Sequence, residues 1–152
     1  SKMDFTILRL FNVYGGNKFL VKNNGVISKW IKCILKKKPL LLDNKGSCIR
    51  DFVYIDDIIK IFEKLISIKK KKISIYNVGS GEKISLNYLL NFLKKVIQKK
   101  NKKKLNLKII NRELDSSQIE YSFSSNKKIK KALNFEFTNL EKGISKIIQN
   151  LF

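Results

Sequence analysis

The sequence predicts an α/β fold built as one unit over residues 1–152. Segments rich in β-branched residues alternate with segments whose apolar residues recur at helical spacing, and this alternation is typical of α/β proteins. No internal repeat and no linker rich in Pro or Gly divides the chain. Hydrophobic residues make up 43% of it, which is enough for a packed core in a chain too short for two comfortable domains.

The first part of the chain predicts a strand, a helix and two more extended segments. Residues 5–11 (FTILRLF) are apolar and β-branched, as in a buried strand. Apolar residues from Gly25 onward recur at helical spacing, and Pro39 ends that helix. Residues 40–42 then predict a short strand, and residues 49–55 a further extended segment after a turn.

The second part predicts four helices and two strands. Asp56 or Asp57 is well placed to cap the first helix, and Ser85 to cap the clearest one. Thr138 and Glu141 have the spacing of a capping box for the last helix. The other expected elements are strands at 73–78 and 105–110 and helices at 127–133 and 140–151.

The net charge of +21 raises the question of nucleic-acid binding. Of the 33 basic residues only three are arginines, although surfaces that read nucleic acid usually use arginine's planar fork. The lysine runs fall at predicted helix ends and loops, where solvated side chains are the simpler explanation. We expect no nucleic-acid partner, and a basic nucleic-acid-binding module is the alternative function from another class.

Residue types that the sequence lacks exclude several kinds of site. There is no His, which removes Ser–His and Cys–His nucleophile arrangements and most zinc sites, so no metal is expected. Two unpatterned cysteines do not suggest a disulfide framework. No apolar run approaches the roughly 20 residues that span a bilayer, and the first residues lack the form of a signal peptide. We expect no membrane partner and a cytoplasmic location.

Four short motifs occur in an order that is more specific than any one of them. They are residues 9–15 (RLFNVYG), residues 46–57 (GSCIRDFVYIDD), residues 76–81 (YNVGSG), and Arg112 with Asp115. In this order the chain resembles the extended short-chain dehydrogenase/reductase family. It is most similar there to NAD-dependent nucleotide-sugar epimerases of the UDP-glucose 4-epimerase kind, and more loosely to nucleotide-sugar dehydratases.

The resemblance implies the C-terminal part of a Rossmann-type NAD(P)-binding fold together with its small α/β substrate-binding domain. Strands 5–12 and 73–79 would belong to an incomplete Rossmann sheet, and residues 13–55 and 80–152 mainly to the sugar-nucleotide-binding subdomain. The N-terminal dinucleotide-binding half is expected to be absent, because the sequence has neither a G-x-x-G-x-x-G turn nor a Tyr-x-x-x-Lys pair. We therefore expect no catalytic residue in this segment, and no activity from it alone.

The resemblance also implies residues that bind the substrate. Arg50 and Arg112 would hold the substrate's diphosphate, which the bidentate guanidinium fork matches well; a structural ion pair with Asp51 is the alternative for Arg50. Asn12 would lie against the same phosphates, or else satisfy the backbone of its turn. Asp115 would accept from the ribose hydroxyls, or be a solvated loop residue.

The base and the nicotinamide would contact apolar positions. Val26 and Leu41 are expected to form walls of the base pocket. Asp43 takes a place where relatives usually offer an aromatic ring, so it could only accept a hydrogen bond from the base. Leu10 and Phe11 match positions against the nicotinamide, although as apolar strand residues they would be buried in any interpretation.

The function implied for the complete enzyme is oxidation and re-reduction of a sugar hydroxyl, with NAD as cofactor and a nucleotide sugar, most simply a UDP-sugar, as substrate. A nucleotide-sugar 4,6-dehydratase or related reductase is the alternative within the family. The complete enzyme is expected to be a homodimer. The sequence leaves open which sugar and which base are bound.

Overall fold

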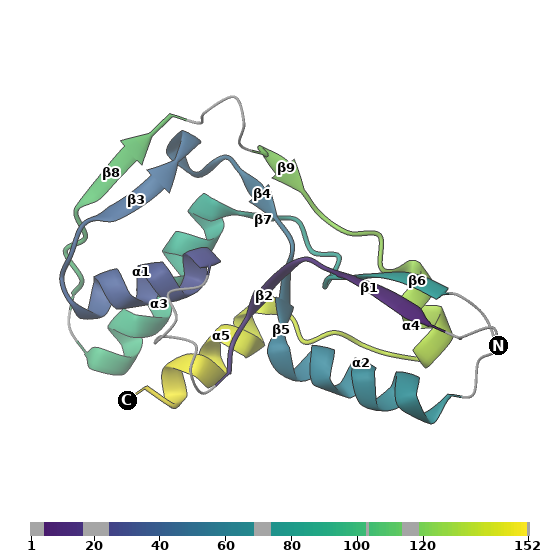
Figure 1. Ribbon diagram of the computed structural model, residues 1–152. Helices are drawn as coiled ribbons and strands as arrows, with labels where there is room; N and C mark the ends of the chain where they lie inside the picture. Colours follow the sequence, from purple (N-terminus) through teal and green to yellow (C-terminus); the bar gives the residue numbers. More distant parts are fainter. Residues whose placement is uncertain (1–4, 17–24, 69–73, 103, 114–118, 152) are drawn as a thin grey trace.

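The computed structural model describes residues 5–16, 25–68, 74–102, 104–113 and 119–151. Figure 1 shows an elongated molecule with β3, β8, α1 and α3 at one end and β1, β6, α2 and α4 at the other. The helices are α1 (Gly25–Leu35), α2 (Ile55–Ser67), α3 (Leu86–Asn101), α4 (Lys127–Leu133), α5 (Leu140–Gln149) and the short 3-10 helix η1 (Asn44–Gly46). None of the described helices is long and apolar enough to cross a membrane.

Short, mostly parallel strand pairs connect segments that are far apart in the sequence. Strand β1 (Thr6–Leu10) pairs with β6 (Ser74–Val78), β2 (Asn12–Tyr14) with β5 (Phe52–Tyr54), and β3 (Leu40–Asp43) with β8 (Ile109–Arg112), all in parallel. Strand β4 (Ile49–Arg50) lies between β7 (Ile84–Ser85), which is antiparallel to it, and β9 (Tyr121–Ser122), which is parallel. The alternation of strands and helices confirms the predicted α/β class.

Strand β5 joins two hydrophobic cores. Because side chains alternate along a strand, Phe52 and Tyr54 enter the core formed with α1, α3 and α5, while Val53 enters the core formed with α2, α4 and β6. All three are buried. A strand buried on both sides fixes the two ends of the molecule relative to each other.

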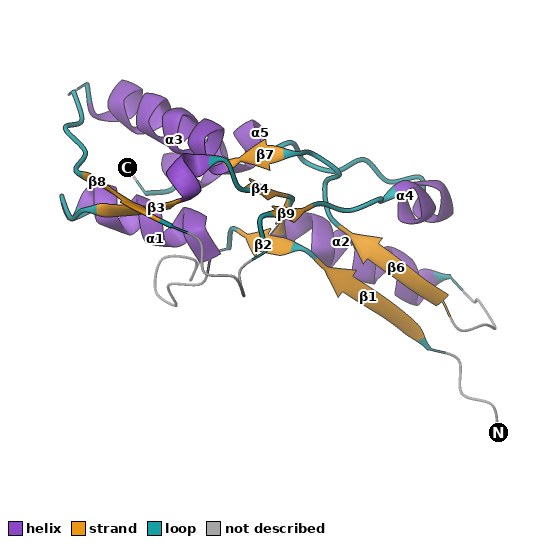
Figure 2. Cartoon of the chain, turned by 90° about the horizontal axis from the view of Figure 1, so that it is seen from above, coloured by secondary structure: helices purple, strands orange, loops and turns teal. Residues whose placement is uncertain are grey.

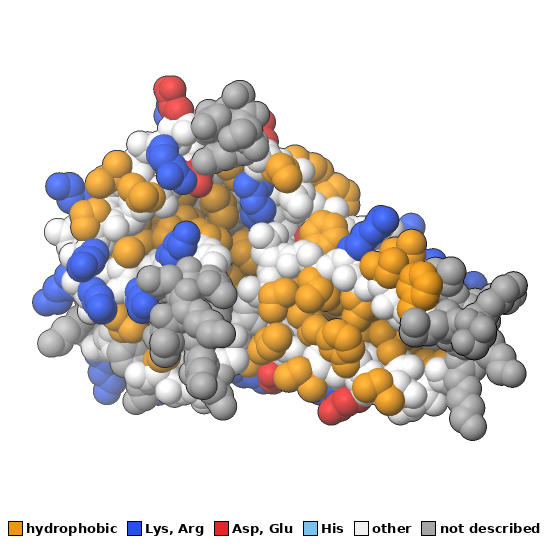
Figure 3. All heavy atoms as spheres, viewed as in Figure 1, with side chains coloured by type: hydrophobic (Ala, Val, Ile, Leu, Met, Phe, Trp, Pro, Cys, Tyr) orange, Lys and Arg blue, Asp and Glu red, His pale blue; other side chains and the backbone are white. Residues whose placement is uncertain are grey.

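One face of the β1–β6 pair is bare in the described part of the chain. Figure 2 shows α2 and α4 on the same side of the two strands. On the other side Ile7 and its register partner Ile75 are 42% and 36% exposed, and Figure 3 shows an apolar surface over this region. Parallel sheets are normally covered on both faces, and two strands alone are marginal. The pair has the form expected of an incomplete sheet.

Helix α2 carries a second exposed apolar stripe. Ile59, Phe62 and Ile66 recur at helical spacing and are 51%, 49% and 84% exposed, whereas Ile58 and Ile61 face the core. An amphipathic helix usually buries a single stripe. Two apolar stripes are typical of a helix that packs against the core with one stripe and against a further element with the other.

Asp51 ties three separate segments together at the junction of the two cores. Its buried carboxylate accepts hydrogen bonds from the backbone N–H and hydroxyl of Ser80, from the N–H of Gly81, and from the N–H and hydroxyl of Ser124, at 2.7–3.1 Å. Its backbone oxygen accepts from both the N–H and the side-chain amide of Asn12. The turn after β6 and the segment before α4 are thus held against β5 by one side chain.

The structure corrects two predicted helix caps and confirms a third. Helix α2 begins directly after Tyr54, so Asp56 and Asp57 lie in its first turn instead of capping it. The buried carboxylate of Asp57 accepts from the N–H and hydroxyl of Thr138 at 2.7 and 2.8 Å, which removes Thr138 from the predicted capping box. The next residue, Asn139, caps α5 instead, while Ser85 caps α3 as predicted.

The strand predicted at 105–110 is displaced toward the C-terminus. The observed strand β8 covers residues 109–112, because its pairing with β3 sets Ile109 opposite Leu40 and Arg112 opposite Asp43. The short strand β9 is not among the elements predicted from the sequence. Long-range pairing, which the local pattern does not encode, decides both boundaries.

Asp51→Asn should lower the free energy of unfolding by about 3 kcal/mol. The variant loses the charged acceptor, and the NH₂ group of its amide faces N–H and O–H donors that then have no acceptor. Urea unfolding followed by far-UV circular dichroism measures the change. Glu63→Gln, which alters an exposed carboxylate on α2, is the matched control and should leave the midpoint unchanged. Equal midpoints for the two variants would contradict the role given to Asp51.

The contact between Tyr14 and Gly143 allows a test in which packing and helix propensity predict opposite changes in stability. The Tyr14 hydroxyl is buried without a hydrogen-bond partner among the described residues, and burial raises its pKa well above the ordinary value. A Cβ on Gly143 of α5 would overlap that hydroxyl. Gly143→Ala should therefore destabilise the chain by about 1–3 kcal/mol, although Ala is ordinarily the better helix former.

Tyr14→Phe should leave the stability unchanged or raise it, since it removes an unpaired buried hydroxyl. It should also reduce the cost of Gly143→Ala in the double variant, because the overlapping oxygen is gone. Thermal and urea unfolding of the native chain, the two single variants and the double variant gives the coupling between the two positions. A Tyr14→Phe variant as unstable as Gly143→Ala would show that the hydroxyl has an important partner.

Candidate functional site

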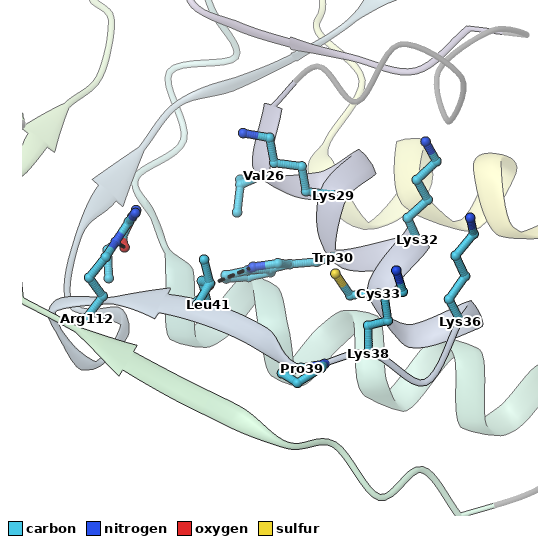
Figure 4. Close-up of a pocket in the computed structure, with 11 residues that line it drawn as sticks. Val26, Lys29, Trp30, Lys32, Cys33, Lys36, Lys38, Pro39, Leu41 and Arg112 are labelled. Atoms are coloured by element: carbon cyan, nitrogen blue, oxygen red, sulfur yellow. Dashed lines mark hydrogen bonds and ion pairs between the residues drawn. The ribbon is translucent and has the colours of Figure 1, made fainter.

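A pocket of about 520 Å³ lies between helix α1, strand β3 and the end of strand β8 (Figure 4). Its apolar part is formed by Val26 and Trp30 of α1 and by Pro39 and Leu41 at the start of β3. The indole N–H of Trp30 donates to the backbone oxygen of Leu41 at 3.0 Å, which fixes the ring against the strand. Trp30 is itself buried, with only 3% of its surface exposed, so the accessible apolar surface of the pocket comes mainly from Val26, Pro39 and Leu41.

The ends of this pocket are charged. Arg112 and Asp43 form one end, where the guanidinium Nε donates to a carboxylate oxygen at 2.7 Å. This hydrogen bond with Asp43 raises the pKa of Arg112 above its ordinary value. Figure 4 shows Arg112 beyond Leu41, while Lys36 and Lys38 lie past Trp30. The full lining is Val26, Lys29, Trp30, Lys32, Cys33, Lys36, Lys38, Pro39, Leu41, Asp43 and Arg112.

Four predicted substrate residues meet in this one pocket. Val26, Leu41, Asp43 and Arg112 come from three separate stretches of the sequence, and all of them line it. Trp30, which the sequence pattern assigned only to the apolar face of a helix, lines it too. The signal that could have found Trp30 is its position one turn after Val26, because residues four apart share a helix face.

Arg50 has different surroundings from Arg112. One of its terminal nitrogens donates to the backbone oxygens of Ile49 and Glu120, and the other to that of Ile119. Arg50 does not line the pocket, and the neighbouring Asp51, proposed as its alternative ion-pair partner, is occupied elsewhere. The guanidinium thus binds the backbone of the two residues that precede β9. Its contact with a diphosphate stays a prediction.

A single residue connects the surroundings of the two arginines. The side chain of Glu120 accepts from Asn44, which follows Asp43 in the chain, while its backbone oxygen accepts from Arg50. Asp115, predicted to contact the ribose, lies outside the described residues. Among the described residues no group of His, Cys, Asp or Glu is arranged to hold a metal ion.

A second hollow, of about 510 Å³, lies at the carboxyl ends of β1 and β6. It is lined by Arg9, Leu10, Phe11, Asn12, Asn77 and Ser122. The amide of Asn12 donates to the backbone oxygen of Asp51, 39 residues further along the chain, at 2.8 Å, and its contact with the phosphates stays a prediction. Arg9 and Asn77 are register partners, so their side chains share the bare face of the sheet. Carboxyl ends of parallel strands are where α/β proteins bind ligands.

Comparison with known proteins identifies the family. Residues 1–79 match the model of the NAD dependent epimerase/dehydratase family. The chain belongs to this family. It is 30% identical to a UDP-glucuronate 4-epimerase of Thermodesulfobacterium geofontis over 149 residues, which are 96% of this chain and 42% of that protein. A CDP-abequose synthase of Salmonella typhimurium is 27% identical over 98% of this chain and 49% of that protein.

A solved structure of the epimerase/dehydratase fold agrees over nearly the whole chain. The UDP-glucose 4-epimerase of Thermotoga maritima, solved with UDP-glucose, matches with a TM-score of 0.81 and 23% identity over 96% of this chain. The match covers 45% of that chain. This epimerase/dehydratase chain therefore spans less than half the length of the relatives compared, and its fold corresponds to part of theirs.

Proposed function

We propose that the chain is the substrate-binding portion of an NAD-dependent nucleotide-sugar epimerase that acts on a UDP-sugar. One observation carries the proposal: Val26, Leu41, Asp43 and Arg112, which the family resemblance places at the nucleotide, line the same pocket. The family also contains dehydratases, so a 4,6-dehydratase is the alternative for the complete enzyme. Both activities need the same anchoring of a nucleoside diphosphate.

The pocket suits a nucleotide because it combines an apolar wall with a cationic end. A base would lie against the exposed side chain of Leu41, and the diphosphate would extend toward Arg112. Guanidinium groups bind phosphate oxygens in pairs, which adds orientation to affinity. Binding energy from the nucleotide, remote from the reacting sugar, would then hold the sugar in a reactive orientation.

The second hollow fits the nicotinamide end of NAD. Leu10 and Phe11 offer apolar surface at the carboxyl ends of two parallel strands, as the family resemblance predicts. When bound, NAD supplies the acceptance and return of a hydride. The residues present here would position the ring, while the glycine-rich turn and the proton-transferring Tyr and Lys would belong to the other half of the fold.

The bare face of β1 and β6 is the surface on which that other half would pack. Ile7 and Ile75 cover the open side of the sheet, and the outer stripe of α2 flanks it. A doubly wound fold would cover the strands with helices on the second face and extend the sheet beside β1. Homodimer formation through that half stays a prediction.

Titration with UDP should change the fluorescence of Trp30, the single tryptophan of the chain, because its buried indole is hydrogen-bonded to the backbone of Leu41 in the pocket wall. Arg112→Ala should weaken the binding at least about tenfold, since a charge-assisted contact with phosphate is lost. Lys108→Ala removes a positive charge from the same region without altering the pocket lining and should bind like the native chain. Unchanged fluorescence, or equal affinity for native chain and Arg112→Ala, would refute the proposed site.

The bare face should bind a hydrophobic dye such as anilinonaphthalene sulfonate when the chain is isolated. Ile7→Lys combined with Ile75→Lys should remove most of the dye signal, because the two side chains are register partners on that face. The matched control is Ile59→Lys with Ile66→Lys on α2, which should remove only a smaller part. Full dye binding by the sheet variant would show that the face is covered in the isolated chain.

A further inference from the structure

Strand pairing brings Asp43 and Arg112 together at the end of two strands. They are the last residues of β3 and β8, and they are register partners in the parallel pair. Parallel register partners place their side chains on the same face. The backbone therefore delivers the carboxylate and the guanidinium to the same end of the pocket, where they form the 2.7 Å hydrogen bond.

The way in which Asp43 binds Arg112 leaves the terminal nitrogens available. A guanidinium has five N–H donors, and Asp43 engages the one on Nε. No other residue in the described part of the chain accepts from Arg112. By contrast, both terminal nitrogens of Arg50 donate to backbone oxygens. Among the described residues, Arg112 therefore keeps the pair of amino groups that a phosphate binds side by side.

The ion pair itself contributes little to stability. The two side chains are 51% and 27% exposed, and ion pairs of this kind are largely screened by water. Its effect is instead on the freedom of a long side chain. Arginine loses rotamer entropy when it binds an anion, and a guanidinium already held at Nε has lost part of it beforehand.

We propose that Asp43 is a positioning residue that holds Arg112 by its Nε so that both terminal amino groups bind the pyrophosphate of a nucleoside diphosphate. The inference rests on the proposed function of the pocket. It gives Asp43 a role toward the phosphates, in place of the contact with the base that its sequence position suggested. It also explains how a carboxylate can stand at the anion-binding end of a pocket without closing it.

The first measurement needs no ligand. The chain has only three arginines, so a nitrogen-15 spectrum of the Nε–H groups contains three signals that single Arg→Lys variants assign. In the native chain the Arg112 signal should exchange slowly with solvent. Asp43→Ala should speed that exchange, whereas Asp43→Asn, whose amide oxygen still accepts from Nε, should largely preserve it. An Arg112 signal unaffected by Asp43→Ala would overturn the inference while leaving the proposed function intact.

The second measurement uses UDP, inorganic pyrophosphate and uridine as separate probes. Asp43→Ala should weaken UDP and pyrophosphate binding by about three- to tenfold, the cost of ordering one long side chain, while uridine binding is unchanged. Asp43→Asn should stay within about twofold of the native chain. In an Arg112→Ala background, Asp43→Ala should have no further effect on pyrophosphate, because the residue acts through Arg112.

Each other outcome has a distinct meaning. Tighter UDP binding by both Asp43 variants would show that the carboxylate competes with phosphate, and weaker uridine binding by Asp43→Ala would show that it contacts the base. Either result overturns the inference although the pocket binds nucleotide. A native chain that binds neither UDP nor pyrophosphate would refute the proposed function, and the inference with it.

Discussion

The arrangement of the pocket and of the second hollow depends on the hydrogen bonds that the buried carboxylate of Asp51 accepts. It stands between β4 and β5, and β5 is the strand whose alternating side chains enter both cores. Its five accepted hydrogen bonds fix the turn after β6 and the segment that leads from β9 to α4. A buried charge is costly unless such donors compensate it, and here the donors are mostly backbone groups that would themselves be unpaired. The same contacts therefore satisfy the carboxylate and the chain around it.

This arrangement constrains the turn that follows β6. A Cβ on Gly79 would overlap the carboxylate of Asp51 and the hydroxyl of Ser124, so the turn must approach as bare backbone. Asn126 then donates its amide to the oxygens of Gly79 and Ser80 on the other side of the turn. The N–H groups of Ser80 and Gly81 in this turn therefore bind the Asp51 carboxylate. Its order also determines where Asn77 and Ser122 meet at the second hollow.

The sequence predicts what depends on local pattern and misses what depends on contact between distant segments. Helix α1, helix α3 with its Ser85 cap, and the existence of strands β1 and β6 follow from periodicity and turn residues, although β1 is predicted to be buried and is mostly exposed. The partner of Asp57 is Thr138, 81 residues away, and no local signal distinguishes that bond from a helix cap. For the site, the family resemblance supplied four pocket residues, but Trp30 looked like any apolar helix position. Its role depends on where β3 passes, which is a tertiary fact.

Two of the three arginines in this lysine-rich chain, Arg50 and Arg112, can be understood from the geometry of their donors. Arg50 bridges backbone oxygens of β4 and of the segment entering β9 with two nitrogens of one planar group, which the single ammonium of a lysine could not span in the same way. Arg112 is held at Nε and keeps its terminal pair. The two residues use the same fork differently: Arg50 joins backbone oxygens beside β4, and Arg112, in the proposed role, directs its terminal amino groups to the phosphates. A lysine would supply the charge at either position but not the planar set of donors.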